Sequence, residues 1–235
     1  MSSTDGPPRA AGTRAEARAL FAAAAMAGRA PSIHNTQPWR WRLTADELNL
    51  HLDHSRALDV TDPDSRLAIM SCGATLHHAL VSLAADGWHA GLARMPDPAH
   101  PDHLARLRLG RRIPVRLEAR RHRQTIGLRH TGHRSAVSAA VDTGNLHAVS
   151  VAAESAGAGL HLLHPDQVHG LARAAVPDRD FGRHGDLPVS ETPGSAAALA
   201  ILYGSGDDEA AWLHSGEALS AAWLTATELA CRSCR

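Results

Sequence analysis

The stretch best suited to binding a ligand is APSIHNTQPW, residues 30–39. Pro31 and Pro38 bracket a run of hydroxyl, imidazole and amide side chains and disfavour a helix there. The amides of Asn35 and Gln37 each carry a donor and an acceptor, so they can recognise the edge of a heterocycle or a row of hydroxyls. The same groups can instead satisfy the backbone of their own loop. Residue chemistry alone favours neither interpretation.

A second candidate is RHTGHRS, residues 129–135, which combines arginine, histidine and threonine just before a predicted helix. Arginine binds phosphate oxygens through strong, often bidentate hydrogen bonds. The chain contains no lysine, so a phosphate would have to be held by arginine, histidine, hydroxyl or backbone N–H groups. The alternative interpretation is a solvated basic turn.

This motif ends a basic tract, residues 106–134, that holds ten arginines and a single acid, Glu118. Such a tract could bind nucleic acid electrostatically. It has no aromatic residue for base stacking, however, and its arginines alternate with Leu, Ile and Val as in a strand with one solvated face. We therefore rank a small anionic ligand above nucleic acid and expect no nucleic-acid partner.

The remaining metal-binding and redox-active residue types are scattered. The histidine pairs at 100/103 and 161/164 lack a close third ligand, so we expect no metal site. Cys231 and Cys234 form a C-x-x-C, but no second such pair and no strand–helix context support a redox centre. Together with Cys72 they are too few for a disulfide scaffold.

The bulk composition is that of a soluble globular protein. The 235 residues suffice for one ample domain or two small ones, and 24 basic residues balance 24 acidic ones. The net charge therefore gives no overall electrostatic attraction to nucleic acid or to a membrane surface. We expect no membrane association, because no apolar run reaches about 18 residues, and a cytoplasmic location, because the N-terminal segment lacks an apolar signal core.

Helices and strands are predicted on both sides of residue 120. The first part should contain a helix ended by Gly28, two alternating strands, a helix ended by Gly87 and two further strands; these regions are 14–27, 39–43, 48–52, 66–86, 88–95 and 104–109. The second part should contain helices at 145–156, 165–175 and from about 208 to 229, strands at 158–164 and 196–204, and a loop at 177–195. We divide the chain into a disordered lead (1–13), a first half (14–119) and a second half (120–235).

Two of these helices share one pattern. Each carries an apolar stripe at steps of four and three residues, with Gly73 near the start of one and Gly216 near the start of the other. A glycine on such a face lets another backbone or a flat ring approach closely. The similar contexts SCGATL and HSGEAL favour a duplicated architecture, although any two amphipathic helices can be aligned in this way.

Taken together, these stretches resemble a known family. The sequences APSIHNTQPWRW, TDPDSRLAIMSCGATLHHALVSLAADGW, RHTGHRS and WLHSGEALSAAWLTATEL are similar to the nitroreductase-like flavoproteins, and in particular to the Acg branch of actinobacterial proteins, which hold two nitroreductase-like halves in one chain. The resemblance covers nearly all of residues 14–235. It implies an α+β fold, nitroreductase-like, with a central, mostly antiparallel sheet, surrounding helices and two pseudo-repeated halves. It also implies noncovalent FMN at the junction of the halves, with NAD(P)H as the electron donor.

The resemblance assigns cofactor contacts to residues of both candidate stretches. Ser32 and Asn35 would line the flavin ring and ribityl chain, and Gln37 would join them or brace the loop. His133 departs from the arginine or lysine usual there, and a neutral imidazole would hold phosphate less firmly, so Arg134 is expected to compensate. The full set of implied FMN contacts is Pro31, Ser32, Asn35, Gln37, Arg129, Thr131, His133 and Arg134; no catalytic residue is assigned.

The chain also departs from that family. The segments LARAAV and PDRDFG nearly abut, whereas relatives place a flavin-covering insertion between them, and relatives continue past the last helix with a loop near the flavin N5 edge and a closing strand. Three functions therefore remain open: an oxidoreductase that reduces a small electrophile with NAD(P)H, a flavin-binding or flavin-sequestering protein with little turnover, and a degenerate paralogue without cofactor. A missing strand would expose a sheet edge, which favours a homodimer. The sequence specifies neither the substrate nor a preference between NADH and NADPH.

Overall fold

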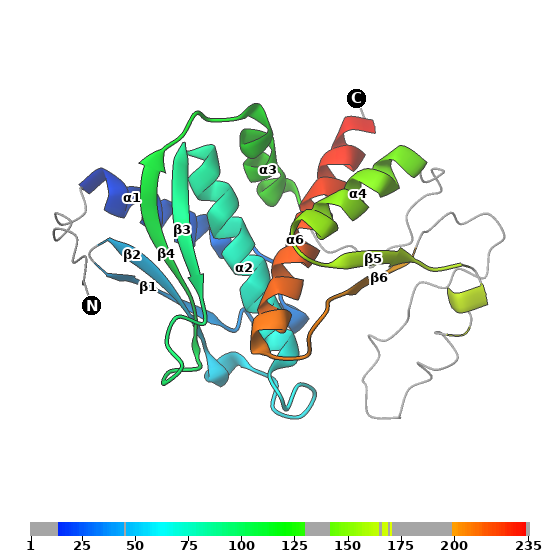
Figure 1. Ribbon diagram of the computed structural model, residues 1–235, viewed down its shortest axis with the longest axis horizontal. Coiled ribbons are helices and arrows are strands. Elements are labelled where there is room, and N and C mark those ends of the chain that lie inside the picture. Colours follow the sequence, from blue (N-terminus) through cyan, green and yellow to red (C-terminus); the bar gives the residue numbers. More distant parts are fainter. Residues whose placement is uncertain are drawn as a thin grey trace, which may run out of the picture.

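The structure is a computed structural model that describes residues 14–44, 46–129, 142–164, 166–168, 170 and 199–233. Among these residues, a four-stranded antiparallel sheet packs against helices, and further helices and a two-stranded sheet follow along the chain (Figure 1). This mixed arrangement of helices with antiparallel sheets confirms the predicted fold class at that level. The expected lead, residues 1–13, lies outside the described residues.

The four-stranded sheet forms where apolar and polar residues alternate in the sequence. Leu48, Leu50 and Leu52 are buried on one side, whereas Arg108 is exposed and pairs with Glu47. The strands predicted in the first half are thereby confirmed, and part of the basic tract is a strand with a solvated face. In spatial order the strands are β1 (Trp39–Thr44), β2 (Glu47–Leu52), β4 (His103–Arg112) and β3 (Trp88–Arg94).

The central helix of the molecule is α2 (Arg66–Ala85), which packs against the sheet and against α1 (Arg14–Ala27). The Asp62 carboxylate accepts hydrogen bonds from the backbone N–H groups of Leu67 and Ala68 and so caps its first turn. Among the described residues, α2 is the one helix long and apolar enough to cross a membrane by length and composition. Its most apolar stretch is 72% buried inside the protein, which is typical of a core helix.

The second part of the chain contributes α3 (Leu117–Leu128), α4 (Thr143–Ser155), α6 (Glu209–Ser233) and an antiparallel pair, β5 (Gly159–Leu162) with β6 (Ala200–Tyr203). The predicted helix near 145–156, the two strands and the last helix are confirmed to within a few residues. The expected helix at 165–175 lies largely outside the described residues, and the expected loop at 177–195 lies wholly outside them.

Helix α3 corrects the sequence interpretation, which read the basic tract only as strand and turn. Pro114 follows the end of β4, and the segment LEARRHRQTIGL is rich in good helix formers. Ile126 from this segment is buried against Val81 and Leu224. The helix also spans the expected boundary at residue 120, so the division into two halves stays a prediction.

Helices α2 and α6 cross at the two glycines that the shared pattern singled out. A Cβ added to Gly73 would lie 2.0 Å from the carbonyl oxygen of Leu213, and one added to Gly216 would lie 1.8 Å from that of Met70. The contact is reciprocal, because each glycine meets the carbonyl three residues before the other glycine. Both glycines therefore serve close approach of two backbones, one of the two predicted uses.

Candidate functional site

A cavity of about 750 Å³ lies at the loop that connects α1 to β1. We call it the loop cavity; it is lined by residues 28–35, Gln37 and Arg129. It therefore brings together five of the eight predicted FMN contacts from two remote parts of the sequence: Pro31, Ser32, Asn35, Gln37 and Arg129. The other three, Thr131, His133 and Arg134, lie outside the described residues.

The loop is held in shape largely by its own hydrogen bonds. Ser32 Oγ accepts from the Gln37 backbone N–H at 3.0 Å, and the Gln37 side chain donates to the Gly28 carbonyl at 3.3 Å. His34 and Asn35 adopt left-handed φ angles of 46° and 58°, as does Gln37 at 50°. Gln37 thus braces the loop, one of its two predicted roles. In the described part of the chain, the Asn35 amide forms no hydrogen bond, so its donor and acceptor can meet a ligand.

The tryptophans after the loop anchor it to the core. Trp39 is buried at the start of β1, and the Trp41 indole N–H donates to Thr75 Oγ1 on α2 at 3.4 Å. The Cys72 thiol, also on α2, donates to the Pro38 carbonyl at 3.3 Å, and burial raises its pKa. Trp39 and Trp41 therefore fix the loop to the start of β1 and to α2.

Arg129 closes the opposite side of the loop cavity, directly after the last residue of α3. Its Nη2 donates to the Arg29 carbonyl at 3.3 Å, and its guanidinium carbon lies 4.8 Å from the centre of the Trp223 ring. Its Nε and Nη1 are buried without a hydrogen-bond partner in the described parts of the chain. Burial lowers the pKa of Arg129, but an arginine stays charged at neutral pH. A half-buried cation with two buried donors that lack a partner in the described chain is suited to an anionic oxygen ligand.

The sequence did not predict several residues of this site. Arg29 and His34 also line the loop cavity, and Trp223 stacks on Arg129 from α6. His34 lies within the APSIHNTQPW stretch, so the motif signalled its position without giving it a role. No signal in the sequence indicated that Trp223, far along the chain, would contact Arg129.

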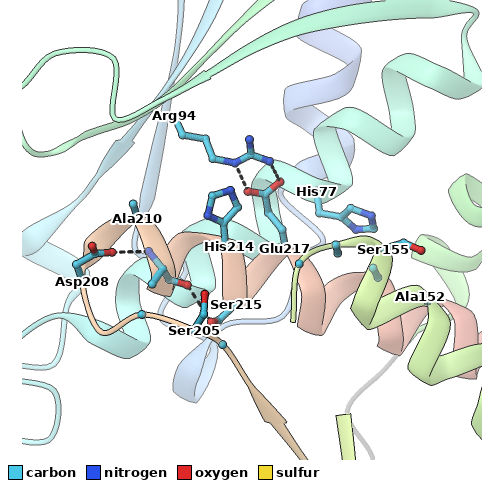
Figure 2. Close-up of a pocket in the computed structure, with 16 residues that line it drawn as sticks. His77, Arg94, Ala152, Ser155, Ser205, Asp208, Ala210, His214, Ser215 and Glu217 are labelled. Carbon is cyan, nitrogen blue, oxygen red and sulfur yellow. Dashed lines mark hydrogen bonds and ion pairs between the residues drawn. The ribbon is translucent and has the colours of Figure 1, made fainter. Parts of the chain in front are cut away.

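Figure 2 shows a second cavity, of about 800 Å³, lined by residues of α2, α4 and α6; we call it the helix cavity. Arg94 Nε and Nη2 donate to the two carboxylate oxygens of Glu217 at 2.7 and 2.8 Å, and Glu217 is only 5% exposed. Burial and, to a smaller extent, nearby His122 lower the pKa of His77 to about 4, so His77 is neutral at pH 7. Asp208 adds a carboxylate.

These charges make the helix cavity a poor anion site, because its arginine is already paired and a carboxylate remains. None of the predicted cofactor contacts lines it. The described residues include no cluster of three or more His, Cys, Asp or Glu side chains that could hold a metal ion. The side chains of Cys231 and Cys234 lie outside the described part of the structure.

The sequence is similar to proteins of Mycobacterium tuberculosis. Rv3131, which is named provisionally as an NAD(P)H nitroreductase, is 32% identical over 256 residues, an alignment that covers 89% of this chain and 73% of the relative. Acg, named in the same way, is 45% identical over 86 residues, which cover 37% of this chain and 26% of Acg. Rv3127, whose name gives no function, is 42% identical over 84 residues, or 34% of this chain. No protein-family model matches the sequence.

Proposed function

Because this chain belongs to the nitroreductase-like family, in the branch that includes Acg, we propose that it is an FMN-binding oxidoreductase of the nitroreductase type. It would reduce a small electrophilic substrate with electrons from NAD(P)H. The observation that carries this proposal is the loop cavity, whose lining combines the Asn35 amide and the Ser32 hydroxyl of one segment with Arg129, a half-buried and incompletely paired arginine of another. Its volume is in the range typical of small-molecule sites.

The residues around the loop cavity fit FMN, which has a planar polar ring at one end and a phosphate at the other. Arg129 offers Nε and Nη1 to the phosphate, and these donors need an acceptor that the described residues do not supply. The Asn35 amide and the Ser32 hydroxyl proton are available for the ring edge or the ribityl hydroxyls. Thr131, His133 and Arg134 are proposed to complete the phosphate site.

When bound, the flavin supplies the redox chemistry, and the protein positions it. Gln37 contributes indirectly, because its bond to the Gly28 carbonyl fixes the loop that carries Asn35. Pro31 presents an apolar ring surface to the same cavity. The anchored tryptophans limit movement of the loop, which reduces the entropy lost when a ligand binds.

We propose one FMN site in each chain, although the architecture is proposed to be duplicated. In the first half, the connection between α1 and β1 runs from Gly28 to Pro38. The corresponding connection between α4 and β5 consists of only Ala156, Gly157 and Ala158. This described connection therefore offers no counterpart of the amide-bearing loop, and a single site would combine the loop of one half with the arginine of the other.

The absorbance spectrum of the purified full chain from 300 to 500 nm, before and after anaerobic addition of NADPH, tests this proposal. A yellow protein that NADPH bleaches is the expected result. A yellow protein that neither NADPH nor NADH bleaches would replace it with a flavin-binding or flavin-sequestering function. A colourless protein whose melting temperature does not rise with added FMN would indicate a degenerate paralogue, because a ligand that binds the native state must raise it.

A further inference from the structure

The helix cavity has room for a small molecule, and the proposed function does not use it. Its volume of about 800 Å³ lies in the range typical of small-molecule sites. Small residues leave that space open: Ala152 and Ala156 line it at the end of α4, and Gly204 and Gly206 line it in the turn before α6. Polar side chains from α2, β3 and α6 complete the lining (Figure 2). The cavity therefore suits a ligand that combines a small apolar body with polar groups.

Three hydrogen-bond donors of this lining are engaged within the protein. The Ser215 hydroxyl donates to the Ala211 carbonyl at 2.8 Å, so its oxygen is left as an acceptor. The Ala211 backbone N–H donates to Asp208 Oδ1, also at 2.8 Å. Arg94 directs Nε and Nη2 to the carboxylate of Glu217. Asp208 and Ser215 are thus joined through one residue, Ala211, and both face the cavity as acceptors (Figure 2).

The acceptors of the cavity are only partly used. An ionised carboxylate can accept about four hydrogen bonds. Within the described part of the chain, Asp208 accepts one side-chain bond, at Oδ1, and forms no ion pair with an arginine. Each oxygen of Glu217 accepts one bond from Arg94 and keeps capacity for another. A ligand that supplies N–H donors would therefore find acceptors waiting for them.

The fixed charges of the described lining favour a cation. Arg94 and Glu217 neutralise each other, so Asp208 leaves one negative charge in excess. His77 is neutral at pH 7, because burial lowers its pKa, and therefore adds no positive charge that would repel a cation. Its Nδ1 lies 2.9 Å from Ser220 Oγ, and its ring lines the cavity from α2.

We propose that the helix cavity binds a small organic cation with several N–H donors, an amidine or a guanidine, through the carboxylate of Asp208 and the hydroxyl oxygen of Ser215. Such planar cations suit a carboxylate because they can donate two parallel hydrogen bonds to it. The apolar part of the ligand would lie against Ala152 and Ala156. None of the residues that line this site lines the loop cavity, so the inference does not depend on FMN.

Titration calorimetry of the full chain with benzamidine, benzamide and benzoate tests this inference, because the three probes share a phenyl ring and differ in charge and donors. Benzamidine should bind, benzamide should bind much more weakly, and benzoate should not bind. Asp208→Asn removes the charge but keeps a side chain that can cap α6, and it should weaken benzamidine binding about tenfold. Ala152→Leu fills part of the cavity without changing its charge, and it should also weaken benzamidine binding.

Glu209→Gln is the matched control. It changes the net charge equally and lies next to Asp208, but Glu209 does not line the helix cavity, so benzamidine affinity should not change. Equal weakening by Asp208→Asn and Glu209→Gln would overturn the inference, because it would indicate a general attraction of charges. Unchanged affinity in Ala152→Leu, equal binding of the three probes, or no binding of benzamidine to wild type would overturn it as well. Added FMN should leave the affinity for benzamidine unchanged; competition between them would place the cation in the loop cavity and contradict the inference.

Discussion

Arg129 is the most important residue of the proposed site, since it combines a positive charge with two buried N–H donors that have no partner in the described chain. Such a group lowers the stability of the empty protein, because buried donors without acceptors lose their hydration. Trp223 compensates in part through its contact with the guanidinium face. A residue of this kind is expected where an anion is bound rather than where a core is packed.

Replacing Arg129 with methionine should therefore weaken FMN binding about 10- to 100-fold, the effect of losing hydrogen bonds to a charged group. The flavin-free protein should be at least as stable as wild type. Fluorescence titration and thermal unfolding measure the two effects. Arg120→Met, an exposed arginine on α3, is the control and should change neither. Unchanged FMN affinity in Arg129→Met would remove Arg129 from the site.

His78 should make the flavin-free protein sensitive to acid. Its pKa is lowered to about 3 in the folded protein, so between pH 6.5 and 3 the unfolded chain binds a proton that the folded chain does not. Stability is thus lost as the pH falls through that window. Between pH 7 and pH 5, the protonation of His78 in the unfolded chain lowers the free energy of unfolding by about 2 kcal/mol. His78→Leu should lose about that much less free energy of unfolding than wild type, measured by urea titration at both pH values; equal losses would contradict the burial of a neutral His78.

The sequence predicted the residues of the loop better than those of helix α2, on which the loop packs. The amides between two prolines pointed to a binding loop, and Gln37 was expected either to contact the ligand or to brace the loop. The left-handed conformations of His34 and Asn35 could not be read, because asparagine and histidine adopt many others. The segment LHHAL contains two adjacent histidines. Its hydrophobic pattern does not indicate that His78, rather than His77, is the fully buried one.

At the scale of elements, the site depends on how α2 and α6 cross. The reciprocal contact at Gly73 and Gly216 sets the closeness of the two helices, and α6 brings Trp223 to Arg129. The ion pair of Arg94 with the buried Glu217 joins β3 to α6. The position of Arg129 over the loop cavity is thus fixed by contacts on other elements.

Gly73→Ala should destabilise the protein by about 3 kcal/mol, because its Cβ would lie 2.0 Å from a backbone oxygen that cannot rotate away. The matched control is Gly127→Ala on α3, where the nearest atom is the end of the Arg29 side chain at 3.5 Å. That control should stabilise by about 0.5–1 kcal/mol, the gain expected for alanine in a helix. Chemical unfolding measures the stability of both variants. A Gly73→Ala protein as stable as wild type would show that α2 and α6 do not cross at this glycine.

Elements were predictable where the hydrophobic period was clear, as in the alternation that gives β1 and β2. Helix α3 was not predicted, because the basic tract was interpreted from its arginines alone. Arginines alternating with apolar residues are compatible with a strand as well as with one face of a helix. The glycine pattern predicted a close approach but not its partner. That α2 and α6 meet at these glycines depends on packing between distant segments, which a single sequence does not reveal.

At the scale of the whole molecule, the strand order leaves β1 and β3 at the edges of the four-stranded sheet. Edge strands carry unpaired backbone groups that can pair with another chain. We therefore predict a homodimer, although Arg40 and Arg42 on β1 oppose simple edge pairing by charge. Sedimentation equilibrium at micromolar concentration should give twice the 24.9 kDa mass of the chain; a single monomeric species would contradict this prediction.

FMN is proposed to bind between the loop and Arg129, and a crystal structure of the full chain with FMN would show where it lies. We expect flavin density in the loop cavity, with the ring near Asn35 and the phosphate within hydrogen-bonding distance of Arg129 Nε and Nη1. Density in the helix cavity beside Glu217, or a loop cavity filled by the protein's own side chains, would contradict it.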